Sequence, residues 1–233
     1  MLVLPVETEK SPLWSAAVEA AEMVESRWVV GLGTGRAASM FVHGLARRVR
    51  GGLSVRSVAT SRATESLARE LEIPMASLDE VDSIDIDVDG ADEVAPNLDL
   101  IKGHGGALVR ERVVASISRR FVVLVGDEKL VPRLGARGAV PVEVVPFAVS
   151  TVFRGLERLG ATVSIRSNGD GRPFASDNGN AILDASFDGI DDPSELSSRI
   201  DSLAGVVDNG LFLGMADLVL VQSADSFRRL ERA

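Results

Sequence analysis

The sequence predicts an α/β protein that has a Rossmann-like parallel sheet domain and a second, smaller α+β domain of the ferredoxin-like type. Short apolar strands alternate with helices through the first half of the chain. Such alternation is typical of a parallel sheet covered by helices on both faces. After Val131 the pattern changes to a proline-rich segment, which a helix, two strands and a second helix follow. We therefore expect one domain to comprise residues 1–131 and 209–233, and the small domain to comprise residues 132–208.

The first elements can be placed from their periodicity. Residues 13–26 are expected to form a helix, because apolar side chains recur there every three or four positions. The next helix follows the glycine turn at residues 31–38 and runs through Val49. Further helices are expected at 64–71 and 107–118, and strands at 28–32, 54–59, 84–88 and 121–125.

The later elements complete the two predicted domains. The small domain is expected to contain helices at 150–160 and 193–204 and strands at 162–166 and 181–186. We interpret the segment that carries Pro132, Pro141 and Pro146 as a connector. The apolar stretch 217–222 is expected to be a strand that returns to the first sheet.

Composition narrows the possible functions. The chain has 233 residues, of which 45% are hydrophobic, so it can bury a substantial core. Its formal net charge of −9 argues against nucleic-acid partners, which basic patches normally bind. The absence of cysteine excludes disulfides and thiolate metal sites. With neither a secretory signal pattern nor an apolar run of membrane-spanning length, we expect a cytoplasmic protein with no membrane partner.

The turn Gly33-Thr-Gly-Arg-Ala lies between a strand and a helix, an arrangement that presents backbone N–H groups to an anion. Thr34 offers a hydroxyl group and Arg36 a bidentate clamp for a phosphate. The alternative is a tight turn with no ligand. A dinucleotide fingerprint is excluded, because Ala38 stands where the third glycine would be.

Acidic residues alternate with apolar ones at Asp85, Asp87 and Asp89, so their side chains should project from one face of a strand. A solvated edge strand would give the same pattern. Gly90-Ala-Asp-Glu extends it, so that Asp89 and Asp92 flank a turn at the end of the strand. We favour the binding of sugar hydroxyl groups there over a divalent cation, because no histidine pair is near in the sequence.

A second glycine-rich turn, Gly103-His-Gly-Gly, follows Lys102 and precedes a helix. Its N–H groups could stabilise a developing oxyanion. It could equally be a flexible loop in which His104 faces solvent. Lys129 follows a buried apolar strand, where it could hold an anionic oxygen or lie in a solvated turn.

Glu111 is the strongest single candidate for a general base. The helical period places it between Val114 and Ala115 and near Leu108, which makes it a carboxylate on an apolar face. Burial of a carboxylate without a partner favours its neutral form and suits a general base that works near neutral pH. The alternative is an ion pair with a neighbouring arginine.

Six motifs in register are similar to those of the ribose-5-phosphate isomerase A family. They are Gly31-Leu-Gly-Thr-Gly, Asp89-Gly-Ala-Asp-Glu, Leu100-Ile-Lys-Gly-x-Gly-Gly-Ala-Leu-x-Arg-Glu, Pro141-Val-Glu-Val-x-Pro-Phe, Ser176-Asp-Asn-Gly-Asn and Gly205-Val-Val-x-Asn-Gly-Leu-Phe. The resemblance extends from about Ala16 to Ala216. It implies interconversion of ribose 5-phosphate and ribulose 5-phosphate through an enediolate, with no cofactor or metal, by a homodimer or homotetramer.

The resemblance also implies roles for individual residues. Glu111 would carry the proton between C1 and C2, Asp89 and Asp92 would hold hydroxyl groups and assist ring opening, and Lys102 and Lys129 would stabilise oxygens. The implied catalytic residues are Glu111, Asp89 and Lys102. The implied substrate-binding residues are Gly33, Thr34, Gly35, Arg36, Ala37, Asp89, Gly90, Ala91, Asp92, Lys102, Gly103, His104, Gly105 and Lys129.

The chain departs from the family pattern around the implied substrate. Arg36 and Ala37 replace two hydroxyl residues of the phosphate turn, His104 replaces a glycine, and Glu128 replaces a serine. A lysine often present in the first helix of the family aligns near Leu13 or Trp14. Two further hypotheses follow: an isomerase of the same family for a modified or different sugar phosphate, and a non-catalytic sugar-phosphate-binding protein.

Overall fold

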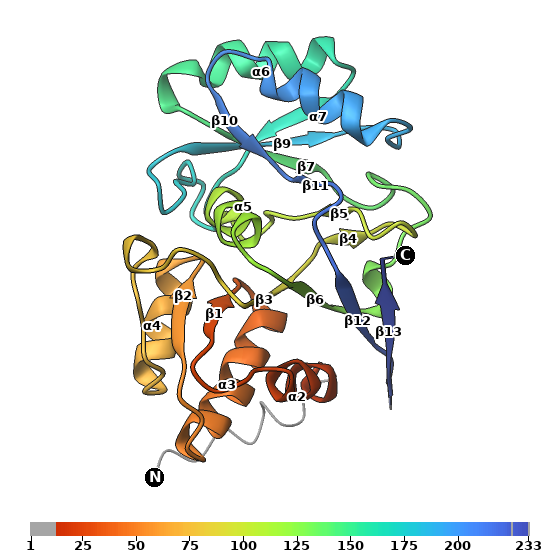
Figure 1. Cartoon of the computed structure of the whole chain (residues 1–233). Coiled ribbons are helices and arrows are strands. Elements are labelled where there is room, and N and C mark those ends of the chain that lie inside the picture. The colour runs from red at the N-terminus through yellow and green to blue at the C-terminus, as the bar shows by residue number, and fades with distance from the viewer. Residues whose placement is uncertain (1–12, 225, 233) are drawn as a thin grey trace. The chain divides into compact units, whose positions relative to one another are not determined.

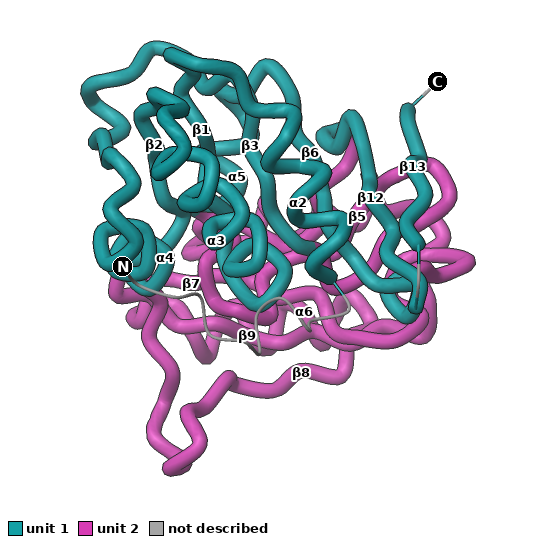
Figure 2. Tube along the Cα trace, turned by 90° about the horizontal axis from the view of Figure 1, so that it is seen from below, with its two compact units in different colours: residues 1–90, 110–129, 215–233 teal, residues 91–109, 130–214 magenta. Residues whose placement is uncertain are grey.

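The computed structural model describes residues 13–224 and 226–232 (Figure 1). The chain forms two compact units (Figure 2). Unit 1 comprises residues 1–90, 110–129 and 215–233, and unit 2 comprises residues 91–109 and 130–214. The domain boundaries expected from the sequence assign residues 91–109 to the first domain, and they stay a prediction.

Unit 1 is built on a six-stranded sheet in the order β13-β12-β6-β3-β1-β2. All neighbouring strands are parallel except β12 and β13, which are antiparallel. The strands are β1 (Val29–Leu32), β2 (Arg56–Ala59), β3 (Ile86–Gly90), β6 (Phe121–Gly126), β12 (Leu218–Gln222) and β13 (Phe227–Glu231). The expected return of the 217–222 strand to the first sheet is confirmed.

Helices cover both faces of this sheet, which requires apolar side chains on both faces of its inner strands. On one face, α2 (Trp14–Glu22) and α3 (Arg36–Arg50) share a core with alternate residues of the strands, among them Val30, Leu32 and Val88. On the opposite face, Val114 of α5 (Leu108–Ser116) packs with Val29 and Val58. A further helix, α4 (Arg62–Glu70), follows β2, and Ser61 caps its N-terminus by accepting from the backbone N–H of Thr64.

The parallel arrangement brings the carboxyl ends of β1, β3, β6 and β12 to one edge of the sheet. The turn to α3 follows β1, and Asp89 lies at the end of β3. The short 3₁₀ helix η2 (Asp127–Lys129) follows β6 directly. Ligands of open α/β sheets bind beyond this edge.

Unit 2 contains a four-stranded antiparallel sheet in the order β10-β7-β9-β8. Its helices pack on one face through buried residues that include Val142, Leu156, Leu183 and Ile200. The elements are β7 (Val140–Val144), α6 (Val149–Arg158), β8 (Thr162–Ile165), β9 (Ala181–Ser186), α7 (Pro193–Asp201) and β10 (Val206–Asn209), with the 3₁₀ helix η3 (Pro146–Ala148) before α6. This β-α-β-β-α-β order is the ferredoxin-like arrangement, so the predicted fold class is confirmed.

The interpretation of the segment around Pro141 as a connector is wrong, because β7 is an inner strand of the sheet. Proline removes a donor from a β ladder and is usually confined to edges. Here the backbone oxygen of Pro141 accepts from the N–H of Gly210 at 2.7 Å, so the N–H that proline lacks would also point toward the β10 side. Pairing of β7 with β10 ends one residue away, at Val142 and Asn209, and no ladder hydrogen bond is lost.

Unit 2 also contains a three-stranded sheet in the order β11-β5-β4. Its strands are β4 (Glu93–Val94), β5 (Leu100–Ile101) and β11 (Leu211–Phe212). Ile101 and Leu211 pack in a buried cluster with Val140 and Ile190. This small sheet supports the segment that carries Asp92 and Lys102.

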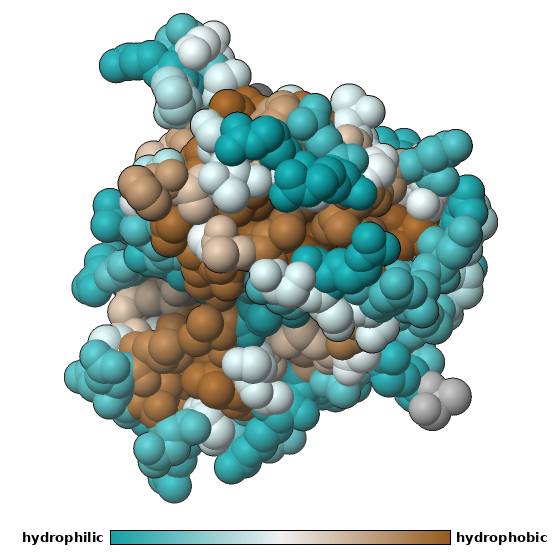
Figure 3. All heavy atoms as spheres, turned by 90° about the horizontal axis from the view of Figure 1, so that it is seen from above, coloured by the Kyte–Doolittle hydropathy of each residue, from teal (hydrophilic) through white to brown (hydrophobic). Residues whose placement is uncertain are grey.

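On the face that Figure 3 views, hydrophobic residues gather in brown patches with hydrophilic residues around them. Among the described residues, none of the helices combines the length and hydrophobicity needed to cross a membrane.

Candidate active site

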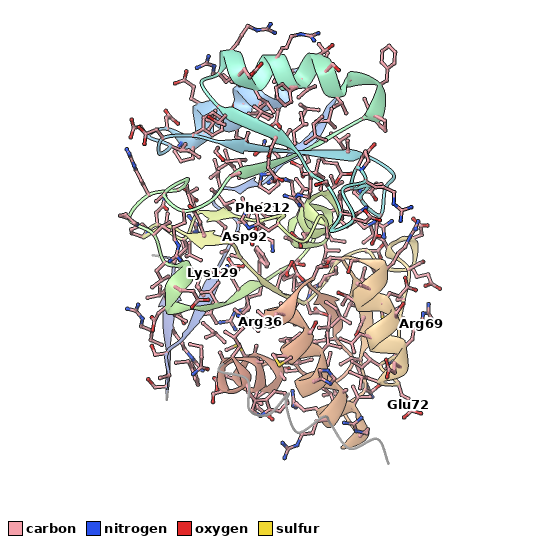
Figure 4. The ribbon with its side chains drawn as sticks, turned by 180° about the vertical axis from the view of Figure 1, so that it is seen from behind. Arg36, Arg69, Glu72, Asp92, Lys129 and Phe212 are labelled. Atoms are coloured by element: carbon pink, nitrogen blue, oxygen red, sulfur yellow. The ribbon has the colours of Figure 1, made fainter. Side chains whose placement is uncertain are left out.

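The turn between β1 and α3 in unit 1 has the geometry of an anion-binding turn. Gly35, the N-cap of α3, has a φ of 97°, and no side chain caps the helix. The first N–H groups of a helix lack intrahelical partners, so an uncapped N-terminus can bind an anion. Arg36 begins the helix and is exposed (Figure 4).

Asp89 is tied to this turn. Its side chain is fully buried, and its Oδ1 accepts from the backbone N–H groups of Thr34 at 2.9 Å and Gly90 at 2.7 Å. A Cβ added at Gly33 would lie 2.2 Å from the Asp89 carboxyl group, so this position requires glycine. The structure thus brings Asp89 next to Gly33 and Thr34, which lie more than fifty residues earlier in the sequence.

The acidic strand β3 is an inner strand, and both Asp87 and Asp89 are fully buried. The alternative of a solvated edge strand is therefore wrong. A Cβ at Gly31 would lie 2.4 Å from Oδ1 of Asp87 and 2.8 Å from Val114, which places Asp87 on the face that α5 covers. Gly90 follows on β3, and a Cβ there would lie 3.5 Å from that of Ala37.

Glu111 lies in the first turn of α5, where only 4% of its surface is exposed. Leu108, Val114 and Ala115 are buried as well, so the expected burial of Glu111 on this helix is confirmed. Leu108, Glu111 and Val114 thus form a buried stripe along this helix.

A pocket of about 360 Å³ in unit 1 lies at the carboxyl edge of the sheet. Arg36 lines it together with Leu13, Gly126, Asp127, Glu128, Gln222, Ser223 and Ala224. The carboxylate of Asp127 accepts from the hydroxyl of Ser223 at 2.5 Å and from Arg228 at 3.3 Å. Arg36 makes no hydrogen bond or ion pair with any residue that the structure describes, so its guanidinium is available to a ligand. Lys129 follows in η2 and is half-buried (Figure 4).

Lys102 of unit 2 is almost completely buried, with 2% of its surface exposed. Its Nζ lies 5.6 Å from the centre of the Phe212 ring, a cation–π contact. The backbone N–H of Lys102 donates to the oxygen of Gly210 at 2.9 Å. These contacts fix the start of the second glycine-rich turn.

The second turn is ordered by hydrogen bonds. Gly103 and Gly106 have φ values of 108° and 79°, and the N–H of Gly106 donates to the oxygen of Gly103 at 2.9 Å. Between them, His104 and Gly105 are exposed. The backbone N–H of His104 donates to Oδ2 of Asp92 at 3.0 Å, and its Nδ1 lies 3.4 Å from Oδ1. Asp92 and the half-buried Ala91 immediately precede β4.

Arg166, which supports this turn, was not predicted as a site residue. Its Nη1 donates to the backbone oxygens of Gly103 at 2.7 Å and His104 at 3.0 Å. Its other nitrogens bind the carboxylate of Asp184, and its guanidinium lies 5.9 Å from the centre of the Phe174 ring. A Cβ added at Gly106 would lie 2.4 Å from that ring. The only signal available beforehand was an arginine at the end of a predicted strand.

Two buried glutamates were also missed as site-supporting residues. Glu93 accepts from the backbone N–H groups of Gly135, Arg137 and Gly138, each at 2.7 Å. Oε1 of Glu143 accepts from the hydroxyl of Ser176 and from the side-chain amides of Asn178 and Asn180, at 2.8–3.1 Å. The Ser176-Asp-Asn-Gly-Asn motif is therefore an ordered turn around a buried carboxylate.

Within residues 13–224 and 226–232, no cluster of three or more histidine, aspartate or glutamate side chains could hold a metal ion. Hydrogen bonds connect predicted site residues into one set within each unit. In unit 1 the set links Gly33, Thr34, Asp89 and Gly90, and in unit 2 it links Asp92, Gly103 and His104.

Unit 1 has a parallel sheet, with an anion-binding turn and a buried carboxylate at the carboxyl edge of its strands. This combination is typical of α/β proteins that bind small anionic ligands. The family model of ribose 5-phosphate isomerase A (phosphoriboisomerase A) matches residues 56–226. The chain belongs to this family.

Individual relatives agree with the family assignment. The chain is 50% identical over 219 residues to ribose-5-phosphate isomerase A of Thermomicrobium roseum, covering 94% of this chain and 92% of the relative. The structure of ribose 5-phosphate isomerase A from Methanocaldococcus jannaschii superposes with a TM-score of 0.91 at 40% identity, covering 96% of this chain and 99% of that one. A D-ribose-5-phosphate isomerase structure in complex with phospho-erythronic acid superposes with a TM-score of 0.93 at 41% identity and the same coverage.

Proposed function

We propose that this protein interconverts ribose 5-phosphate and ribulose 5-phosphate through an enediolate. The observation that carries the proposal is the hydrogen bond from Thr34 to Asp89, which joins an anion-binding turn to a buried carboxylate in a chain of this family. An aldose–ketose isomerase needs both parts, one for the phosphate and one for the sugar. The reaction needs no external oxidant or reductant, because it only moves one proton from C2 to C1 and one from O2 to O1.

Glu111 is the proton carrier in this proposal. It removes the proton from C2 of the open-chain aldose and delivers it to C1 of the enediolate, while the hydroxyl proton on O2 is transferred to O1. The burial of its side chain supports this role, because a base held away from bulk water exchanges its proton with the substrate and not with solvent.

The remaining side chains hold oxygens of the substrate. Asp89 and Asp92 bind hydroxyl groups and assist opening of the ring, while Lys102 and Lys129 stabilise the oxygens that carry charge in the enediolate. Lys102 is suited to this, because its burial strengthens its interaction with a developing oxyanion. The second glycine-rich turn, with Gly103, His104 and Gly105, supplies backbone contacts.

Arg36 holds the phosphate together with the N-terminus of α3. The formal net charge of −9 repels an anionic substrate at long range, so the binding site needs a local positive charge. Arg36 is exposed, lines the unit 1 pocket and pairs with no described residue, which leaves its five donors for a phosphate. Gly33, Thr34, Gly35 and Ala37 complete this part of the site.

Assembly as a homodimer or homotetramer and a cytoplasmic location belong to the same proposal. They rest on family membership and on a sequence without cysteine.

A panel of sugar phosphates tests the substrate. We expect ribose 5-phosphate to give the highest kcat/KM, and Arg36→Gln to raise its KM about tenfold or more with little change in kcat, since a charge-assisted phosphate contact is worth ~1.5–3 kcal/mol. Arg62→Gln, an exposed arginine at the start of α4, is the matched control.

Two results would contradict the proposal. A higher kcat/KM for another sugar phosphate would favour the second hypothesis, an isomerase of different specificity. Tight binding of ribose 5-phosphate with no turnover would favour the non-catalytic sugar-phosphate-binding protein.

A further inference from the structure

We infer that His104 is a positioning residue that fixes the orientation of the Asp92 carboxylate. The inference rests on the proposed function, in which Asp92 holds a substrate hydroxyl and assists ring opening. It assigns His104 a role that differs from the substrate contact expected from the sequence, because His104 acts through Asp92.

One residue contacts both carboxylate oxygens of Asp92. The backbone N–H of His104 donates to Oδ2 at 3.0 Å, and Nδ1 of its ring lies 3.4 Å from Oδ1. A carboxylate held by only one of these contacts can still turn about its terminal torsion, which is soft. The second contact removes this freedom.

The imidazole ring is itself held from the opposite side. Its Nε2 lies 3.4 Å from the backbone oxygen of Ala139. A Cβ added at Gly138 would lie 3.1 Å from Cε1 of the ring, so only glycine leaves comfortable room there. The N–H of Gly138 donates to the buried Glu93, which fixes the segment behind the ring.

The main chain of His104 is fixed as well. Arg166 donates to its backbone oxygen at 3.0 Å and to that of Gly103 at 2.7 Å. Arg166 is in turn held by Asp184. The imidazole therefore lies between Asp92 and Ala139 on a backbone with little freedom to move.

Both ring nitrogens face oxygens that accept hydrogen bonds. Asp92 is only partly accessible, with 18% of its side chain exposed, while 45% of the His104 side chain is exposed. The Asp92 carboxylate therefore keeps a lone pair available to a ligand while His104 occupies other lone pairs of its oxygens. A glycine at residue 104 would retain only the backbone contact with Oδ2.

The test uses side-chain variants that leave the backbone N–H in place. We expect His104→Ala to lower kcat for ribose 5-phosphate about three- to tenfold, as loss of one hydrogen bond predicts, with KM changed less than about twofold. His104→Asn should recover most of kcat, because its amide nitrogen lies near the position of Nδ1. His104→Gln, whose donor lies nearer the position of Nε2, should recover less.

A double-mutant cycle separates action through Asp92 from an independent role. The double variant His104→Ala with Asp92→Ala should lose no more activity than Asp92→Ala alone, since contacting residues that act as a unit are not additive. His43→Gln, which changes the other histidine of the chain, should keep wild-type kcat. Thermal unfolding of each variant verifies that it is folded.

The outcomes distinguish the inference from the proposed function. If wild type does not isomerise ribose 5-phosphate, the proposed function is wrong and the inference with it. If wild type is active and Asp92→Ala is impaired, wild-type kcat in His104→Ala overturns the inference alone. Additive losses in the double variant, or a rise in KM with unchanged kcat, would also overturn it.

Discussion

Single buried carboxylates hold several loops around the candidate site by accepting hydrogen bonds from them. Asp89, Glu93 and Glu143 are almost completely buried, and each accepts two or three hydrogen bonds on the oxygens described above. Burial of a charge is costly unless donors compensate for it. Such residues therefore fix the loops that supply the donors.

The sequence predicted the acidic residues at the site but could not distinguish these supporting glutamates from surface ones. The donors of Glu93 lie more than forty positions away, and they are backbone N–H groups, which carry no mark in the sequence. Asp89 was predicted because its glycine turn and alternating pattern are local.

Glu93→Gln tests this role at the residue scale. The amide has one acceptor oxygen in place of two, and its NH₂ group would face a backbone N–H. We expect a loss of about 1–3 kcal/mol in the free energy of unfolding, measured by urea denaturation. The control is Glu157→Gln on the exposed surface of α6, which should change stability by less than about 0.5 kcal/mol. Equal effects of the two changes would contradict the role given to Glu93.

Among the elements, the sheet of unit 2 has two distinct faces. Helices α6 and α7 cover the apolar face, while the opposite face carries Arg166 and Asp184, which hold the second glycine-rich turn. The register of β7 and β9 shows this division, because directly paired residues lie on the same face of a sheet. Pro141 pairs with Asp184 on one face, and Val142 pairs with Leu183 on the other. The second glycine-rich turn is thus supported by polar side chains on the sheet face opposite the helices.

Elements with strong periodicity were predicted well, and short or irregular ones were not. The helices and long strands of unit 1 were found near their expected positions, since their apolar faces repeat clearly. Strand β7 was missed because Pro141 indicates a break when the partner strands are unknown. Strands β4, β5 and β11 have only two residues each, too few to show any period.

Arg166→Ala tests the support of the glycine-rich turn. We expect kcat for ribose 5-phosphate to fall about tenfold, because two backbone oxygens lose their donor and the turn gains freedom. Arg166→Lys should restore little, since lysine lacks the fork that binds Asp184. Arg172→Ala, an exposed arginine in the same loop region, should leave kcat unchanged. An unimpaired Arg166→Ala variant would show that the turn needs no such support.

At the scale of the whole molecule, each compact unit is assembled from separate stretches of the chain. Unit 1 requires three segments and unit 2 requires two, so both depend on contacts between distant residues. The return of β12 to the sheet beside β6 was predictable from its apolar run. The edge strand β13 was not, because Phe227–Glu231 is mostly charged and largely exposed.

The net charge is also a property of the whole molecule. Because it is negative, an anionic ligand must be bound by positive side chains at the site itself. The predicted substrate-binding cations are Arg36 and Lys129 of unit 1 and Lys102 of unit 2, in a chain with more acidic than basic residues. These cations could be identified beforehand, because Arg36 and Lys129 follow predicted strands and Lys102 precedes a glycine-rich turn. Their exact surroundings could not, since they depend on residues such as Phe212 and Ser223.

The most direct test of the account is the turnover of ribose 5-phosphate by wild type and by Glu111→Gln, followed by NMR in deuterated water. Loss of a general base should lower the rate about 10²–10⁴-fold, while an unchanged unfolding temperature would show that the fold is intact. We predict that wild type forms ribulose 5-phosphate and that Glu111→Gln falls within this range. A decrease of less than about tenfold would contradict the assignment of Glu111 as the proton carrier.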